Sequence, residues 1–162
     1  MAEDLKEIMA KEKLSRADFL GFSDGANLAM MFAKKYPDSV NRLVLNSGNT
    51  TTDGLNKIAI FLFHLVENWD SFLGFFSKRY KQKGQITDLI TRNIGVSKAD
   101  LTKIKNPTLV IVGQRDVIKL SHSRYIAKTI PNSKYVVIPK NGHTLARTDP
   151  VSFNTEVLKF LI

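Results

Sequence analysis

Three side chains of the kinds used in nucleophilic acyl transfer each follow an apolar, strand-like run of this sequence. They are Ser23, Asp116 and His143. A serine hydroxyl becomes an effective nucleophile when an imidazole accepts its proton and a carboxylate holds that imidazole in the required tautomer. The carboxyl ends of parallel strands share one edge of a sheet, so residues far apart in the sequence can meet there. The three residues therefore predict the chemistry of ester or amide hydrolysis.

Ser23 lies at the centre of Gly21-Phe22-Ser23-Asp24-Gly25, which has the pattern G-x-S-x-G. A strand-like run precedes this pentapeptide and a helix-like run follows it, so the serine is expected at a sharp turn between them. Such a turn strains the serine backbone and holds its hydroxyl above the carboxyl end of the sheet. A Cβ at either flanking position is expected to collide where strand and helix pass closest. Both Gly21 and Gly25 are therefore predicted to be required.

The elements that position these side chains are predicted from apolar patterning and from helix and strand end signals. Strands rich in β-branched residues alternate with helices, which predicts an α/β protein with a parallel sheet of about four strands covered on both faces. The whole chain, residues 1–162, is expected to form one domain, and residues 54–95 interrupt the alternation with aromatic-rich helical segments. The predicted strands are residues 17–22, 40–45, 108–112 and 135–138, and the predicted helices are residues 3–13, 24–36, 97–104, 121–130 and 151–161.

Composition narrows the classes of function. A hydrophobic fraction of 43% and a charged fraction of 24% are ordinary globular values. The net charge is +9, but the basic residues are spread along the chain, with one cluster at 78–83, so no nucleic-acid partner is expected. Cysteine is absent, no apolar run approaches the length of a membrane span, and the polar start does not resemble a signal peptide. We expect a cytoplasmic protein without membrane partners. No histidine pair has the spacing of a zinc helix, so no metal is expected.

The chain resembles the α/β-hydrolase family, in particular its esterase and lipase members, over essentially all 162 residues. The resemblance is carried by Gly-Phe-Ser-Asp-Gly-Ala-Asn at the turn, Val-Gly-Gln-Arg-Asp as acid loop and Asn-Gly-His-Thr as histidine loop, in the order Ser, Asp, His of that fold. It implies that Ser23 is the nucleophile, Asp116 the orienting acid and His143 the general base. It also implies that the N–H of Asp24 stabilises an oxyanion. The implied activity is hydrolysis of small carboxylic esters through an acyl-enzyme, without a cofactor.

The same resemblance implies that residues 54–95 form the helical cap that such enzymes insert between the two halves of the fold. Aromatic side chains of this cap that face the serine would favour an apolar acyl or alcohol group by excluding water. The candidates for this substrate pocket are Phe61, Trp69 and Phe72.

One departure from the family concerns the residues that precede the turn. An ordinary member has about four strands before this point, including a loop that supplies a second oxyanion donor, whereas here only twenty residues precede Gly21. Loss of one such donor typically costs about 10² to 10³ in rate. We therefore expect a truncated fold with weak activity. The missing strands would also leave an apolar edge at Asp18, Phe19 and Leu20, which predicts a homodimer in which a second copy covers that edge.

Other interpretations remain open for each residue. Ser23 can be a small turn residue, Asp116 a helix-capping carboxylate and His143 a surface loop residue. The remaining histidines and two rival carboxylates do not end strands and are weaker candidates: His64, His122, Asp53 and Asp149.

Two other functions also remain open. The chain can be a non-catalytic remnant that binds a ligand or a partner, or it can keep the triad and transfer acyl groups or cleave C–C or thioester bonds. Fold-level resemblance does not separate these chemistries.

Overall fold

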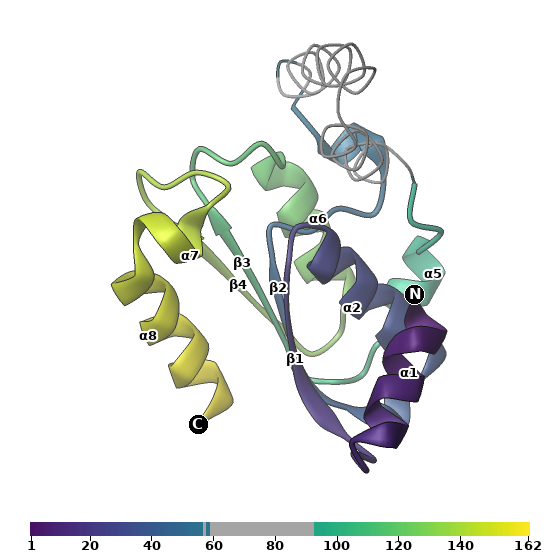
Figure 1. The fold of residues 1–162 in the computed structure, drawn as a ribbon. Helices are drawn as coiled ribbons and strands as arrows, with labels where there is room; N and C mark the ends of the chain where they lie inside the picture. The colour runs from purple at the N-terminus through teal and green to yellow at the C-terminus, as the bar shows by residue number, and fades with distance from the viewer. Residues whose placement is uncertain (57, 59–92) are drawn as a thin grey trace, which may run out of the picture.

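A computed structural model describes residues 1–56, 58 and 93–162 of the chain. Its strands form one parallel sheet in the order β1-β2-β3-β4, which is also their order in the sequence (Figure 1). The predicted α/β fold with a four-stranded parallel sheet is thus confirmed, and each observed strand lies within two residues of its predicted ends. The strands are β1 (Ala17–Phe22), β2 (Val40–Asn46), β3 (Thr108–Gly113) and β4 (Ser133–Ile138).

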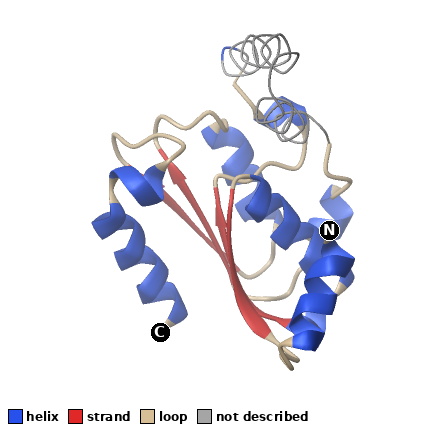
Figure 2. Ribbon diagram, viewed as in Figure 1, coloured by secondary structure: helices blue, strands red, loops and turns tan. Residues whose placement is uncertain are grey.

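Helices cover both faces of this sheet (Figure 2). On one face, α1, α2, α5 and α6 enclose a core around Phe32, Met30 and Leu43. On the other, α7 and α8 pack Leu145 and Phe153 against β2, β3 and β4. The helices are α1 (Ala2–Lys11), α2 (Asp24–Lys35), α5 (Lys98–Leu101), α6 (Leu120–Thr129), α7 (Leu145–Thr148) and α8 (Pro150–Leu161), with 3-10 turns at Pro37–Ser39 and Thr52–Gly54.

A local capping signal explains the start of α5, whereas α7 has no such signal. Ser97 begins α5 with the predicted cap, because its side chain accepts from the Asp100 N–H while the Asp100 carboxylate accepts from the Ser97 N–H. This helix is shorter than predicted, ending at Leu101. The sequence did not predict α7, because four residues are too few to show helical periodicity.

The register of the sheet brings the loops after β1, β2 and β3 to one edge. Phe22 at the end of β1 pairs with Asn46 at the end of β2, so Ser23 and Ser47 leave the sheet side by side. Asn46 in turn pairs with Ile111, shortly before the end of β3. The three loops therefore start from neighbouring positions.

Strand β1 lies at an edge of the described sheet and pairs with β2 alone within it. Leu20 and Phe22 are 52% and 42% exposed. Phe19 departs from the prediction of an exposed apolar edge, because it is only partly exposed and its ring lies 4.8 Å from the ring of Phe32. The apolar surface that remains exposed on this strand comes from Leu20 and Phe22.

The predicted cap at residues 54–95 falls mostly outside the described residues, as do the pocket candidates Phe61, Trp69 and Phe72 and the histidine His64. The two ends of this segment are described and lie side by side. The Ile94 N–H donates to the Thr50 carbonyl at 3.4 Å, and the Thr52 N–H donates to the Asn93 side chain at 3.1 Å. The chain thus leaves and re-enters the described fold at one place.

Candidate active site

Ser23 occupies the turn between β1 and α2 with a strained backbone. Its φ is 53° and its ψ is −117°. Residues other than glycine rarely adopt such a positive φ. The turn is held in place because the Ser23 N–H donates to the Asn46 carbonyl at 2.8 Å, while the Ser23 carbonyl accepts from the N–H groups of Ala26 and Asn27. The hydroxyl is therefore presented from a fixed position at the carboxyl end of the sheet.

The two glycines of the G-x-S-x-G motif are not equivalent. A Cβ on Gly21 would overlap the backbone carbonyl of Gly25 and the N–H of Ala26, so the strand and helix can approach only if this residue is glycine. A Cβ on Gly25 would meet nothing within 4 Å. The prediction that both glycines are sterically required was therefore wrong for Gly25, because at that position the Cβ points into open space.

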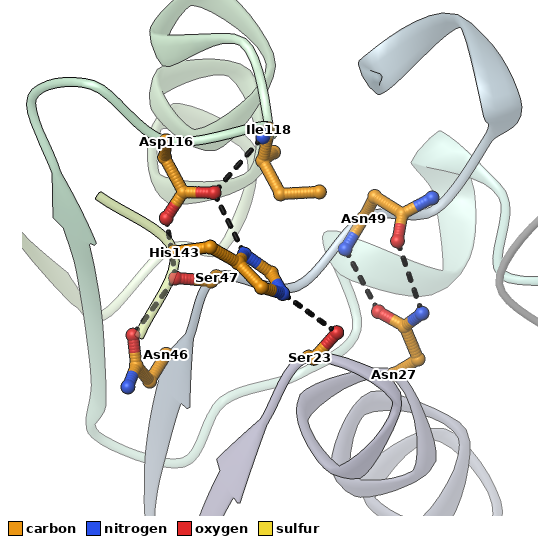
Figure 3. Close-up of polar contacts among 8 residues, drawn as sticks. All are labelled: Ser23, Asn27, Asn46, Ser47, Asn49, Asp116, Ile118 and His143. Carbon is orange, nitrogen blue, oxygen red and sulfur yellow. Dashed lines mark hydrogen bonds and ion pairs between the residues drawn. The ribbon is translucent and has the colours of Figure 1, made fainter. Parts of the chain in front are cut away.

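The structure brings Ser23, His143 and Asp116 together in one chain of hydrogen bonds (Figure 3). The Ser23 Oγ lies 3.1 Å from His143 Nε2, and His143 Nδ1 lies 2.8 Å from Asp116 Oδ1. The Asp116 side chain has no exposed surface, whereas that of His143 is 22% exposed. A buried carboxylate next to Nδ1 favours the tautomer with the proton on Nδ1, which leaves Nε2 free to accept the serine proton.

Further donors surround the Asp116 carboxylate. Oδ1 also accepts from the Ile118 N–H at 2.9 Å, and Oδ2 accepts from the Ser47 hydroxyl at 2.6 Å. Burial is the largest single influence and would raise the pKa of Asp116. The hydrogen bonds from His143, Ile118 and Ser47 together outweigh it, so the pKa of Asp116 lies below its ordinary value. The carboxylate is thus kept ionised beside His143.

Asp24 is the residue that directly follows Ser23. It is the first residue of α2, and its N–H has no acceptor in the described part of the chain. Unpaired N–H groups at a helix N-terminus attract negative charge. The Asp24 side chain faces the nearby Asn27 amide, and its pKa is raised by burial, an effect that Asn27 and His143 partly oppose.

Three polar residues that were not predicted from the sequence also shape this site. Ser47 contacts Asp116, and a pair of buried asparagines joins α2 to the loop after β2. Asn49 donates its N–H to Asn27 Oδ1 at 2.8 Å, and Asn27 Nδ2 donates to Asn49 Oδ1 at 3.1 Å. Their place in the sequence could have indicated Ser47 and Asn49, because both lie in the loop after β2, which ends at the same edge of the sheet as Ser23.

The rival carboxylates and the second described histidine do not contact Ser23, His143 or Asp116. Asp149 accepts from the Ser152 N–H and caps α8, while Asp53 is exposed in a 3-10 turn. His122 Nε2 accepts from the Thr50 N–H at 3.1 Å. Burial, and then the nearby charge of Lys119, lower the pKa of His122. These side chains support loops instead of extending the hydrogen-bond chain.

A cavity of about 350 Å³ lies next to this hydrogen-bond chain. It is lined by Phe22, Thr144, Ala146 and Arg147. The Phe22 ring centre lies 5.0 Å from that of His143, so one residue that lines the cavity also packs against the imidazole. Small apolar groups fit such a surface, and the single Arg147 supplies a positive charge at its rim.

Within residues 1–56, 58 and 93–162, no group of three or more His, Cys, Asp or Glu side chains is arranged to hold a metal ion. No helix in the same ranges is long and apolar enough to cross a membrane.

Comparison with known proteins gives a family match and relatives that are similar over nearly all of this chain. A family model described as the alpha/beta hydrolase fold matches residues 1–82. A protein of Bacillus subtilis (strain 168), provisionally named a 2-succinyl-6-hydroxy-2,4-cyclohexadiene-1-carboxylate synthase, is 28% identical over 98% of this chain and 70% of its own length. The human protein named serine hydrolase BPHL is 23% identical over 99% of this chain and 60% of its own length.

A solved structure shares the fold. The meta-cleavage product hydrolase CumD from Pseudomonas fluorescens IP01 has a TM-score of 0.76 and 20% sequence identity, covering 99% of this chain and 70% of that chain. At this identity the similarity concerns the fold alone. The match extends over nearly all of the present chain and leaves about a third of CumD without a counterpart.

Proposed function

The chain belongs to the alpha/beta hydrolase fold family, and from that premise we propose that it is a serine hydrolase that cleaves small carboxylic esters. The observation that carries this proposal is the hydrogen-bond chain from Ser23 Oγ through His143 to Asp116. Hydrolase is also the activity named for the human relative and for CumD.

In the proposed reaction, His143 Nε2 takes the proton of Ser23 as the Oγ attacks the ester carbonyl carbon. Asp116 accepts the hydrogen bond from the Nδ1–H of His143 and stabilises the imidazolium that forms. The N–H of Asp24 donates to the oxyanion, and the proton on Nε2 passes to the leaving alcohol as the C–O bond breaks. Water, deprotonated by His143, then attacks the acyl carbon of the acyl-enzyme, and His143 returns that proton to Ser23 Oγ as the acyl C–O bond breaks and the acid is released.

The proposed preference for small esters rests on two features of this site. An alcohol leaves more readily than an amine, so an ester requires less oxyanion stabilisation than an amide, and the unpaired N–H of Asp24 is the one donor that this proposal uses. The cavity beside His143 is lined largely by the side chains of Phe22, Thr144 and Ala146 and is of a size for a short acyl group.

The test uses p-nitrophenyl acetate and butyrate together with a fluorophosphonate probe that labels activated serines. We expect the chain to turn over the esters and to be labelled, and we expect Ser23→Ala to abolish both. Ser15→Ala is the matched control, because Ser15 is exposed and lies before β1, at the far end of the strand from Ser23. Ester turnover that survives Ser23→Ala would rule out the mechanism.

A second candidate keeps the same triad but acts on a different bond. It is favoured by the name of the Bacillus subtilis relative, which is a synthase and not a hydrolase. Labelling of Ser23 by the probe without turnover of either ester would support this candidate. If the serine remains unlabelled, the chain is instead a non-catalytic member that binds a ligand or a partner.

A further inference from the structure

We propose that Ser47 is a positioning residue for the reaction of Ser23, acting through Asp116; this inference rests on the proposed function. The two oxygens of the Asp116 carboxylate have separate partners. Oδ1 accepts from His143 and from the Ile118 N–H, while Oδ2 accepts from the Ser47 hydroxyl at 2.6 Å. Ser47 thus fixes the carboxylate oxygen that His143 does not contact.

Ser47 is the donor on which Oδ2 depends. The Asp116 side chain has no exposed surface, and in the described part of the chain Oδ2 has no other donor. A buried, ionised oxygen that loses its donor bears the full cost of desolvation. Without the Ser47 hydroxyl, Asp116 would have to rotate toward another donor or take up a proton. Either change disturbs the bond to His143 Nδ1.

The position of Ser47 is itself tightly held. Its side chain is 2% exposed, and its φ of 58° is in the left-handed region that disfavours side chains. Its N–H donates to the Ile111 carbonyl at 3.1 Å, which ties the residue to β3. A strained, buried serine in contact with a carboxylate is more than a small turn residue, because glycine would fit the backbone with less strain.

Asn46 completes the arrangement from the other side. The Asn46 Oδ1 lies 2.9 Å from Ser47 Oγ. In this orientation of the amide, Asn46 Nδ2 is buried without a hydrogen-bond partner in the described part of the chain. A hydroxyl has one proton, and here the carboxylate takes it. The amide is therefore expected to rotate so that Nδ2 donates to Ser47 Oγ, an assignment set by the hydrogen-bond network.

The same dipeptide also contacts the nucleophile. The Asn46 carbonyl accepts from the Ser23 N–H at 2.8 Å, and the Ser47 side chain donates to Asp116 (Figure 3), so consecutive residues hold the serine backbone and the acid side chain. Through this link, the end of β2 sets the distance between Ser23 and Asp116. His143 has to span that distance for proton transfer.

The test compares Ser47→Ala and Ser47→Gly with wild type. Both remove the hydroxyl, but glycine also relieves the positive φ, so the pair separates hydrogen bonding from backbone strain. We expect both variants to lose about ten- to a hundredfold in kcat for p-nitrophenyl butyrate, with KM little changed. Ser123→Ala is the control, because Ser123 is equally buried and its hydroxyl has no partner in the described part of the chain. A fully active Ser47→Gly would overturn the proposal.

A second measurement does not depend on activity. The carboxyl carbon of Asp116 is titrated by NMR in wild type, both Ser47 variants and Ser123→Ala, after circular dichroism has established that each is folded. Loss of a donor to the charged form raises the pKa of Asp116 in both Ser47 variants but not in the control. An unchanged titration refutes the role of Ser47. If wild type does not turn over the esters, the proposed hydrolase function is refuted. If the pKa of Asp116 is nevertheless raised in both Ser47 variants, the Ser47–Asp116 contact remains supported.

Discussion

Asp116 shows how a single residue is adapted to its neighbours in this site. Its side chain is fully buried, yet three donors keep its pKa below the ordinary value. One donor is the imidazole of His143, and the other two, Ile118 and Ser47, hold the carboxylate in the plane and direction that this imidazole needs. Two of the three donors, His143 and Ser47, therefore come from loops other than that of Asp116 itself.

Asp116→Asn is expected to keep the fold and lower kcat for small esters by about 10⁴, because the amide can donate to Nδ1 and so favours the wrong tautomer of His143. The carboxylate also contributes stability that is present above its unfolded pKa of about 3.9 and is lost as pH falls through the lowered folded pKa. In urea unfolding, the stability difference between wild type and the variant should therefore shrink below about pH 4.

The control for this variant is Asp149→Asn. Asp149 caps α8 and does not contact His143, and asparagine caps a helix about as well as aspartate, so this change should alter stability and kcat little. An Asp116→Asn enzyme with nearly wild-type kcat would show that the carboxylate does not orient the base.

At the scale of elements, close backbone approaches decide where the functional loops lie. Gly21 allows β1 to meet the start of α2, and Gly113 allows the end of β3 to pass the loop before His143, where a Cβ would overlap the backbone of Asn141 and Gly142. The Arg115 N–H then donates to the Asn141 carbonyl at 2.8 Å. The acid loop and the histidine loop are thus joined by backbone contacts as well as by side chains.

The two glycines of the turn give a matched pair of substitutions. Gly21→Ala is expected to destabilise the protein by about 1 to 3 kcal/mol, because its methyl group would overlap the backbone of Gly25. Gly25→Ala places a methyl in open space within a helix and should stabilise by about 0.4 to 1 kcal/mol. Urea unfolding measures both. Equal destabilisation by the two changes would contradict this account of the turn.

For the whole molecule, the main feature is the position of Ser23 directly after a strand at the edge of the described sheet. Ser23 follows β1, which has no neighbour on its outer side within the described sheet, and Leu20 and Phe22 on this strand are exposed. Exposed strand edges with apolar side chains associate with other chains. We propose that a second copy of the chain covers this edge.

Light scattering at several concentrations tests this association. We expect a dimer for wild type and a shift toward monomer for Leu20→Lys, because a charge on the edge opposes strand pairing. Ile8→Lys is the control for added surface charge, because Ile8 is exposed on α1 and does not lie on the strand edge. It should leave the dimer unchanged. A wild-type monomer at all concentrations, without binding of a dye for apolar surface, would refute the dimer.

Most elements of this fold could be predicted from the sequence, because their signals are local. The strand at Ala17–Phe22 was predicted with its observed ends, and the Ser97 cap was recognised from a serine followed by Asp100. The convergence of Ser23, Asp116 and His143 was expected from strand ends alone, since parallel strands present their carboxyl ends at one edge. These inferences need only patterning, turn chemistry and topology.

Only the tertiary structure revealed what lies between such elements. The bond from Ser47 to Asp116 joins residues 69 positions apart and depends on the register of β2 against β3. Whether Gly25 or Phe19 is constrained likewise depends on which neighbour occupies the space beside it. The sequence alone determined which segments form strands and which reactive side chains follow them, because these depend on local periodicity and residue type. The tertiary structure decided which other side chains contact and orient these reactive side chains. Such contacts depend on distances between segments of the chain that no local pattern encodes.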